Sequence, residues 1–217
     1  AVGHTVRVTD SELNVTDCKI PYIAKPARVA FDGLDPWFTI GGMHLIVRRD
    51  VVAEAPHPDR TLSKWGKGQS PFDEWCLFLA TLAGDVVLDP EELAFWRRHQ
   101  TATTGDPQVS QATQRKNMWK RSGADNYAHL ADVAQSRADF AASYRGRLPT
   151  RPGVVEFYRR IAGTYRRRAE LYTQGRSRRS RACILASMAS RRDYRPRQSG
   201  GLGLHSLLKD TYVVGLR

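Results

Sequence analysis

The segment from Arg159 to Arg197 carries the side chains with the clearest capacity for specific chemistry, because arginine replaces lysine throughout it. An arginine guanidinium is a planar fork that pairs bidentately with a phosphate and stacks on bases, whereas a lysine ammonium acts as a point charge. This composition predicts contact with the backbone of a nucleic acid, such as structured RNA. The candidate nucleic-acid-binding residues are Arg159, Arg160, Arg166, Arg167, Arg168, Arg176, Arg178, Arg179, Arg181, Arg191 and Arg192.

The same arginines admit two other interpretations. They could form a solvated helix face whose long stems cover apolar surface, or they could bind an acidic protein surface or anionic lipid headgroups. Three tyrosines are interleaved with them, and aromatic rings stack on unpaired bases. Tyr165 belongs to an apolar stripe and is expected in the core, whereas Tyr158 and Tyr172 are candidates for either role.

The charge of the chain is large and unevenly distributed. The 217 residues include 34 Lys and Arg against 22 Asp and Glu, a net charge of +12. Residues 1–100 hold 11 basic and 14 acidic side chains, whereas residues 101–217 hold 23 and 8, a net of +15. Repulsion of that size destabilises a compact state unless counter-charge is nearby. We therefore expect RNA and neighbouring protein subunits as partners in a large assembly.

No arrangement typical of catalysis or of a metal site occurs in the sequence. The histidines are scattered singly, and the cysteines lack the spacing of zinc ligands or of a disulfide framework. We expect a protein that is not an enzyme and that has no catalytic residue, metal or cofactor. The three cysteines favour a reducing intracellular compartment, either the mitochondrial matrix or the cytoplasm. The longest mostly apolar stretch, Trp75 to Leu88, is too short to cross a bilayer, so no transmembrane segment is expected.

The first quarter of the chain has the pattern of strands. Thr5–Val8, Ala27–Ala30 and Trp37–Val47 are apolar or alternating, and Gly41-Gly42 in the last run suits a bulge. A small antiparallel sheet is predicted over residues 1–52. Residues 53–69 are rich in Pro, Gly and charge and are expected to form a linker or an exposed loop.

After residue 70 the pattern changes to that of helices. Three similar starts are expected at Ser70-Pro71, Asp89-Pro90 and Asp106-Pro107, where a side chain can cap the helix and proline occupies its first turn. The most regular apolar stripe, in residues 153–174, places an apolar side chain at every fourth position. The predicted helices span residues 72–83, 107–121, 126–145, 153–174 and 181–192, with a short element at 204–208.

These patterns predict an α+β fold, in which a small N-terminal antiparallel sheet is followed by a mostly helical body. The expected regions are a β-rich part (1–52), the linker or loop (53–69), a helical part (70–146) and a basic helical C-terminal part (147–217). The predicted function is that of a structural subunit of a large ribonucleoprotein, similar to an organellar ribosome, that binds RNA phosphates through a C-terminal arginine-rich helical ridge. Two alternatives remain open: an accessory subunit of a mitochondrial respiratory or other membrane-associated complex, and a viral coat or nucleocapsid protein.

Overall fold

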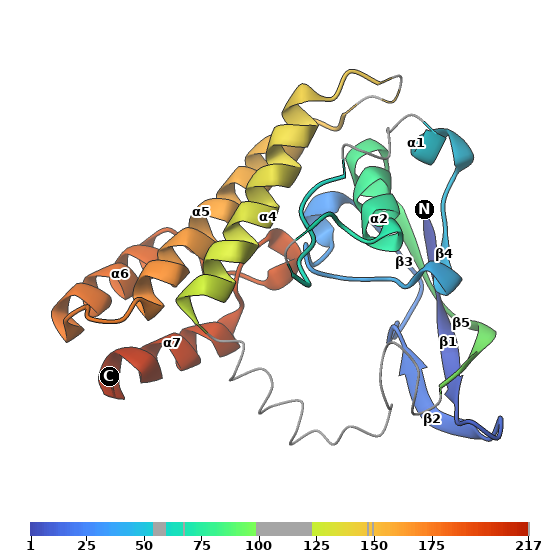
Figure 1. Ribbon diagram of the computed structural model, residues 1–217, viewed down its shortest axis with the longest axis horizontal. Coiled ribbons are helices and arrows are strands. Elements are labelled where there is room, and N and C mark those ends of the chain that lie inside the picture. Colours follow the sequence, from blue (N-terminus) through green and yellow to red (C-terminus); the bar gives the residue numbers. More distant parts are fainter. Residues whose placement is uncertain (54–59, 67, 99–122, 147, 149, 217) are drawn as a thin grey trace.

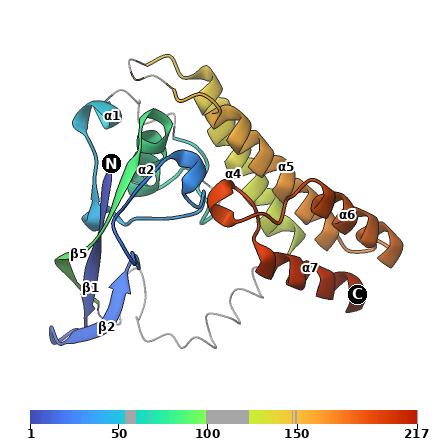
Figure 2. The ribbon, with the colours of Figure 1, turned by 180° about the vertical axis from the view of Figure 1, so that it is seen from behind.

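The computed structural model describes residues 1–53, 60–66, 68–98, 123–146, 148 and 150–216. An N-terminal sheet with a helix of 12 residues packed against it adjoins a body of helices (Figure 1). The predicted α+β class is therefore confirmed. The arrangement of two distinct layers is equally clear from behind (Figure 2).

The sheet has five strands and is mixed, not purely antiparallel as predicted. Its order is β2-β1-β5-β3, and β4 pairs with the beginning of β1. The two longest strands, β1 and β5, run parallel, and the other pairs are antiparallel. The strands are β1 (Val2–Thr9), β2 (Val15–Ile20), β3 (Ala27–Val29), β4 (Leu45–Ile46) and β5 (Val86–Arg97).

Strand β5 replaces the helix that was predicted to start at Asp89-Pro90. In its register with β1, Asp89 pairs with His4 and Glu92 pairs with Thr5, so Pro90 and the residue after it form a bulge. A proline is tolerated at such a bulge because its missing N–H is not needed by the ladder. The carboxylate of Asp89 accepts a hydrogen bond from the N–H of residue 91 at 3.0 Å, which is the interaction a helix cap would also make. The predicted helix start is therefore wrong, because the same local hydrogen bond occurs here at a bulge within a strand.

The extended run predicted at Trp37–Val47 is mostly not a strand. A short 3-10 helix, η2 (Gly42–His44), interrupts it, and only β4 is paired. The ring of His44 is buried and lies beside Gly41, where a Cβ atom would come within 2.7 Å of the imidazole. The predictions at residues 5–8 and 27–30 are confirmed by β1 and β3, whereas β2, which alternates between half-buried and exposed residues, was not predicted.

Most of the predicted helices are present with small shifts at their ends. The prediction over residues 107–121 lies outside the described residues. Ser70 does not cap α2, because its hydroxyl donates to the carbonyl of Leu62 at 2.9 Å. The helices are α1 (Arg49–Ala53), α2 (Phe72–Ala83), α4 (Ala124–Ser143), α5 (Val154–Tyr172), α6 (Arg178–Ser190) and α7 (Leu204–Leu216).

Helix α2 joins the two layers because it is buried on more than one side. Leu77 packs with Val86 and other residues of the sheet layer, whereas Trp75 and Phe78 belong to the large core of the helical body. Helices α4 and α5 lie side by side along most of their length (Figure 1). Small side chains on α4 allow this close approach. Four alanines of α4 are almost fully buried: Ala131, Ala134, Ala138 and Ala141.

The described part of the segment between the sheet and α2 is packed against the body. The N–H of Leu62 donates to the hydroxyl of Ser136 at 3.2 Å, and a ring nitrogen of His129 lies 2.8 Å from the carbonyl oxygen of Ser63. Both partners belong to α4. Within the described residues, no helix is long and apolar enough to cross a membrane.

Candidate nucleic-acid interface

The candidate arginines lie on α5, on α6 and in the turns that flank α6. Along α5, Arg159 and Arg166 are seven residues apart, about two helical turns, and so lie on one face. Arg160 and Arg167 repeat that spacing beside them. The opposite face of α5, which includes Phe157 and other apolar residues, fills the core. The amphipathic pattern of the sequence therefore places most of these arginines on the outside.

Arg168 is an exception, because it belongs to the buried face of α5. Its guanidinium donates to Asp210 of α7 at 2.9 and 3.2 Å, and the hydroxyls of Tyr172 and Tyr194 donate to the same carboxylate. Burial opposes the charge of the guanidinium, but the attraction of Asp210, the hydrogen bond to it and the nearby Tyr127 and Tyr172 together outweigh burial and raise the pKa of Arg168 above its ordinary value. Arg168 is a structural residue that holds α7 on α5, and its prediction as an outward-facing member of the ridge is wrong.

Arg181 is also withdrawn from the surface. Its side chain is buried, and one of its nitrogens donates to the carbonyl of Thr173, the residue that ends α5, at 3.2 Å. A cation at that position offsets the partial negative charge of a helix C-terminus. Its predicted outward position is wrong too, because a residue in the second turn of α6 faces back towards α5.

Arg167 is partly structural and partly exposed. It forms a bidentate pair with Asp193, with nitrogen–oxygen distances of 2.9 and 3.0 Å, and the hydroxyl of Thr164 donates to the same carboxylate at 3.0 Å. About a quarter of its side chain, 26%, is still exposed. This pair ties the residues after α6 to the middle of α5, so the end of α6 lies next to the exposed arginines of α5.

The remaining eight candidates are exposed, and we refer to them as the exposed arginine face. Arg160 and Arg166 donate to the neutral partners Ser199 and Gln135 at 3.2 and 3.3 Å, and the pair between Arg176 and Glu170 is long, at 3.5 Å. Within the described residues, the other members have no carboxylate within salt-bridge distance. The members are Arg159, Arg160, Arg166, Arg176, Arg178, Arg179, Arg191 and Arg192.

The charge around this face is almost entirely of one sign. Residues 151–217 hold 16 basic and 4 acidic side chains, a net of +12, whereas residues 1–150 hold 18 of each. Beyond Glu170 the only carboxylates of the sequence are Asp193 and Asp210, which are 3% and 0% exposed and already paired with arginines. The surface of α6 and α7 therefore presents no carboxylate to solvent.

The start of α6 strengthens the positive character of the face. Ser177 caps the helix by accepting a hydrogen bond from the N–H of Ser180 at 3.2 Å, and the first turn contains Arg178 and Arg179 but no acidic residue. The N-terminus of a helix already carries partial positive charge, so arginines there are electrostatically unfavourable for the isolated helix. An anion bound at this end would relieve that repulsion.

The tyrosines interleaved with the arginines are not available for base stacking. Tyr158, Tyr165 and Tyr172 are all buried in the core of the helical body. Tyr165 also accepts a hydrogen bond from the indole of Trp37 at 2.8 Å, and burial raises its pKa to about 12. The exposed face is therefore suited to phosphates and not to stacked bases.

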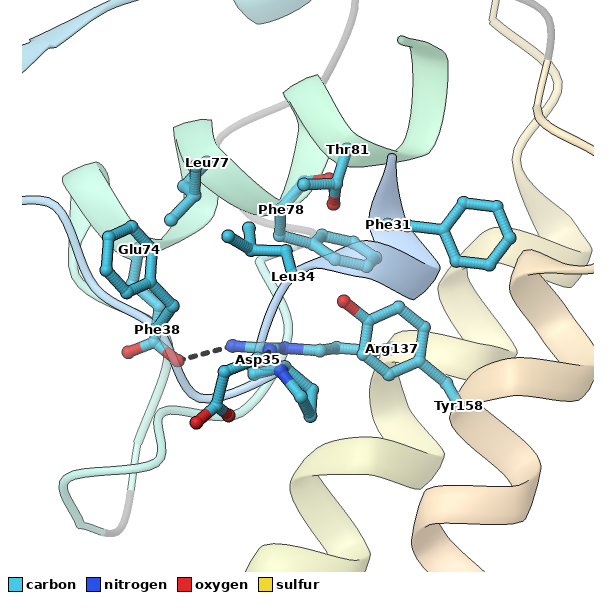
Figure 3. Close-up of a pocket in the computed structure, with 11 residues that line it drawn as sticks. Phe31, Leu34, Asp35, Phe38, Glu74, Leu77, Phe78, Thr81, Arg137 and Tyr158 are labelled. Carbon is cyan, nitrogen blue, oxygen red and sulfur yellow. Dashed lines mark hydrogen bonds and ion pairs between the residues drawn. The ribbon is translucent and has the colours of Figure 1, made fainter. Parts of the chain in front are cut away.

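The described residues also contain one polar cavity, between α2 and α4, that sequence reasoning did not find. Arg137 of α4 donates to Glu74 of α2 at 2.5 Å (Figure 3). It also donates to the carbonyl of Pro36 at 2.9 Å. The guanidinium lies near the aromatic rings of Phe78 and Tyr158, at 5.6 and 5.7 Å from their centroids. The cavity beside the pair measures about 20 Å³, enough for one water molecule. The two charges neutralise each other, and we interpret this pair as a joint between the layers.

The chemistry of other candidate groups is limited in the part of the chain that the structure describes. No three His, Cys, Asp or Glu side chains come together as metal ligands there. His4 and His44 lie with their ring centroids 6.3 Å apart, and burial lowers the pKa of His44 below its ordinary value. The three cysteines are free thiols.

No family model matches the chain, and neither a curated protein nor a solved structure is similar to it. The site is therefore interpreted from its own geometry.

Proposed function

We propose that this protein is a non-catalytic structural subunit of a large ribonucleoprotein and that the exposed arginine face holds RNA phosphates. The observation that carries this proposal is the imbalance of exposed charge beyond Glu170. Every carboxylate of that region is buried and paired internally, so the exposed arginines of α6 have no acidic neighbour on the same helix. Counter-charge must then come from outside the region, and a phosphate backbone supplies it at regular intervals.

The shape of the face supports a backbone ligand. Helix α5 has 19 residues, so its exposed side extends for about 28 Å. A row of guanidinium groups along such a length can follow a chain of phosphates, and contacts of this kind position RNA without reading its sequence. The buried tyrosines leave no aromatic platform among the arginines to read bases.

The experiment that tests the proposal is a salt titration of RNA binding. We expect the affinity for a fluorescently labelled RNA hairpin to fall steeply between about 50 and 200 mM salt, with a log–log slope of about −4 to −6 for six or seven phosphate contacts. Replacement of Arg178 and Arg179 by Ala removes two contacts and should make the slope less negative by about 1.4 to 1.8. The change should be the same for every RNA sequence.

A matched control removes two arginines of the sheet layer. Arg28 and Arg48 are also exposed, but each pairs with a carboxylate, at 2.6 Å in both cases. The Arg28→Ala/Arg48→Ala variant should keep the wild-type slope. A wild-type slope near zero, or equal losses in the two double variants, would contradict the proposal. Binding to anionic vesicles in place of RNA would favour the accessory subunit of a membrane-associated complex.

A further inference from the structure

Helix α7, the last element of the fold, has two faces of different character. Its inner face contains Ser206, Asp210 and Val213, all of which are buried. Asp210 is fully buried and receives hydrogen bonds from one arginine of α5 and two tyrosines. This face therefore fixes α7 firmly against the helical body.

The outer face of α7 carries a line of large apolar side chains. Leu204, Leu208 and Tyr212 are 69%, 63% and 58% exposed, although each is large enough to contribute to a core. They follow one another at intervals of four residues, so they form a single ridge about 12 Å long. We refer to these three residues as the α7 ridge. A ridge of this spacing is the feature that packs into the groove of a second helix.

The charge around the α7 ridge defines the kind of helix that fits it. The neighbouring helix α6 contains no acidic residue, and the one carboxylate of α7, that of Asp210, is buried. The charged side chains that α6 and α7 expose are therefore all positive. An apolar helix flanked by Asp and Glu would bury its apolar side chains on the ridge and would place its carboxylates beside the arginines of α6.

We infer that the α7 ridge is the docking site for an acidic amphipathic helix of a neighbouring protein subunit. This inference goes beyond the proposed RNA contact, because it concerns a different surface and a different class of partner. RNA is a poor partner for most of the ridge, since two of its three side chains are leucines, which neither pair with phosphates nor stack on bases. A second copy of the chain would bring its own +12 charge and repel the first.

A membrane surface also fits the ridge less well than a helix does. Interfacial helices expose a wide apolar face that is buried in the lipid boundary. The exposed apolar side chains among the described residues of α7 are in single file, because Val213 and Val214 pack against the core and Leu207 is half-buried. A narrow ridge matches a groove between the side chains of one partner helix.

The test uses the full chain and two designed probe peptides. Both peptides have the same leucine-lined helical face, and their remaining positions are glutamate in one and lysine in the other. We expect the acidic peptide to bind and the basic peptide to bind at least tenfold more weakly, as measured by fluorescence anisotropy. Leu208→Ser should weaken binding of the acidic peptide by about tenfold or more, because a buried leucine is replaced by a polar side chain.

A control variant and an RNA measurement complete the design. Phe95→Ser alters an equally exposed side chain, 69% exposed, on the sheet layer and should leave peptide binding unchanged. RNA binding by Leu208→Ser should equal that of the wild type, which separates this inference from the proposed function. Absence of peptide binding up to about 1 mM would overturn the inference. It would also be overturned if Leu208→Ser abolished self-association of the protein or binding to anionic vesicles, with peptide binding unaltered.

Discussion

The sheet layer and the C-terminal part of the helical body differ in where their carboxylates lie. In the sheet layer, Glu92 lies near the surface and pairs with both Arg7 and Lys19, at 2.7 and 2.5 Å. Asp85 likewise pairs with two arginines, Arg28 of β3 and Arg151 just before α5, each at 2.6 Å. Beyond Glu170, in contrast, both carboxylates of the helical body are buried and paired with arginines of α5.

This difference separates charge that completes a fold from charge that is available to a partner. The sheet layer compensates its basic side chains on its own surface, so its arginines gain little from an external anion. The helical body uses its last two carboxylates to fix α6 and α7. Apart from Arg176, the members of the exposed arginine face have no carboxylate within salt-bridge distance among the described residues. Net charge alone would not distinguish the two regions, whereas the burial of the carboxylates does.

The comparison can be tested most strongly at two arginines of the same helix. Arg168→Met leaves the carboxylate of Asp210 buried without its cation, and we expect a loss of about 3 kcal/mol or more in the free energy of unfolding. Arg166→Met removes an exposed side chain that donates only to Gln135, and its effect should stay within about 0.5 kcal/mol. Urea titrations of the two variants make the measurement. Equal losses would show that burial does not divide the arginines as described.

A smaller effect is expected from Lys64, which interacts electrostatically with Glu74 and Arg137 and makes the free energy of unfolding depend on pH. Lys64 donates to the carbonyl of Trp37 and to the hydroxyl of Thr39. Burial lowers the pKa of its ammonium from 10.5 to about 8, and the charge of Glu74 opposes this shift while that of Arg137 reinforces it. Between pH 8 and 10 the unfolded chain therefore holds a proton at this lysine that the folded chain has lost.

The sign of this effect follows from proton linkage. Where the unfolded state binds more protons, stability rises with pH, so Lys64 contributes an increase of about 1.4 kcal/mol per pH unit over that range. We expect the unfolding free energy of the wild type relative to Lys64→Met to rise with this slope from pH 8 to 10 and to be flat below pH 8. The difference between the two proteins cancels the titration of the other groups. A flat difference throughout would show that Lys64 is solvated.

The sequence predicted the helical body better than the sheet, for reasons that concern particular residues. The apolar residues of α5 recur at strongly regular intervals, and the same residues fill the core in the structure. Strand β5 was mistaken for a helix because Asp89-Pro90 makes the same local hydrogen bond at a bulge as at a helix start. The parallel pairing of β1 with β5 joins residues more than 80 positions apart, which no local pattern records.

The candidate site was partly predictable for a similar reason. The face of a helix on which an arginine lies follows from its spacing, so the exposed position of Arg159 and Arg166 could be inferred. The burial of Arg168 depends on Asp210, which is 42 residues away and becomes its partner only when α7 packs on α5. The pair between Glu74 and Arg137 depends on the joining of two layers. A basic residue at the edge of an apolar stripe is the one sequence signal that would have identified Arg168.

The smallest expected effect on stability comes from charge reversal at the two ends of α6. At Arg179 this change should raise thermal stability and lower RNA affinity, so it separates folding from binding. Arg179 lies in the first turn of α6, and Arg191 is the residue that ends the same helix. A carboxylate is favourable at a helix N-terminus and unfavourable at its C-terminus, in each case by about 0.3–1 kcal/mol. Arg179→Glu should therefore raise the thermal stability, whereas Arg191→Glu should lower it.

Both substitutions remove the same amount of positive charge from the exposed arginine face, so both should weaken RNA binding to a similar extent. If Arg179→Glu makes the protein more stable and weakens RNA binding, then Arg179 lowers the stability of the fold but contributes to binding. This result is expected for a residue that contacts a phosphate. If Arg179→Glu lowers the melting temperature, Arg179 makes a structural interaction instead. If neither variant changes RNA affinity, α6 does not contact the RNA, and the contact would have to be sought on α5.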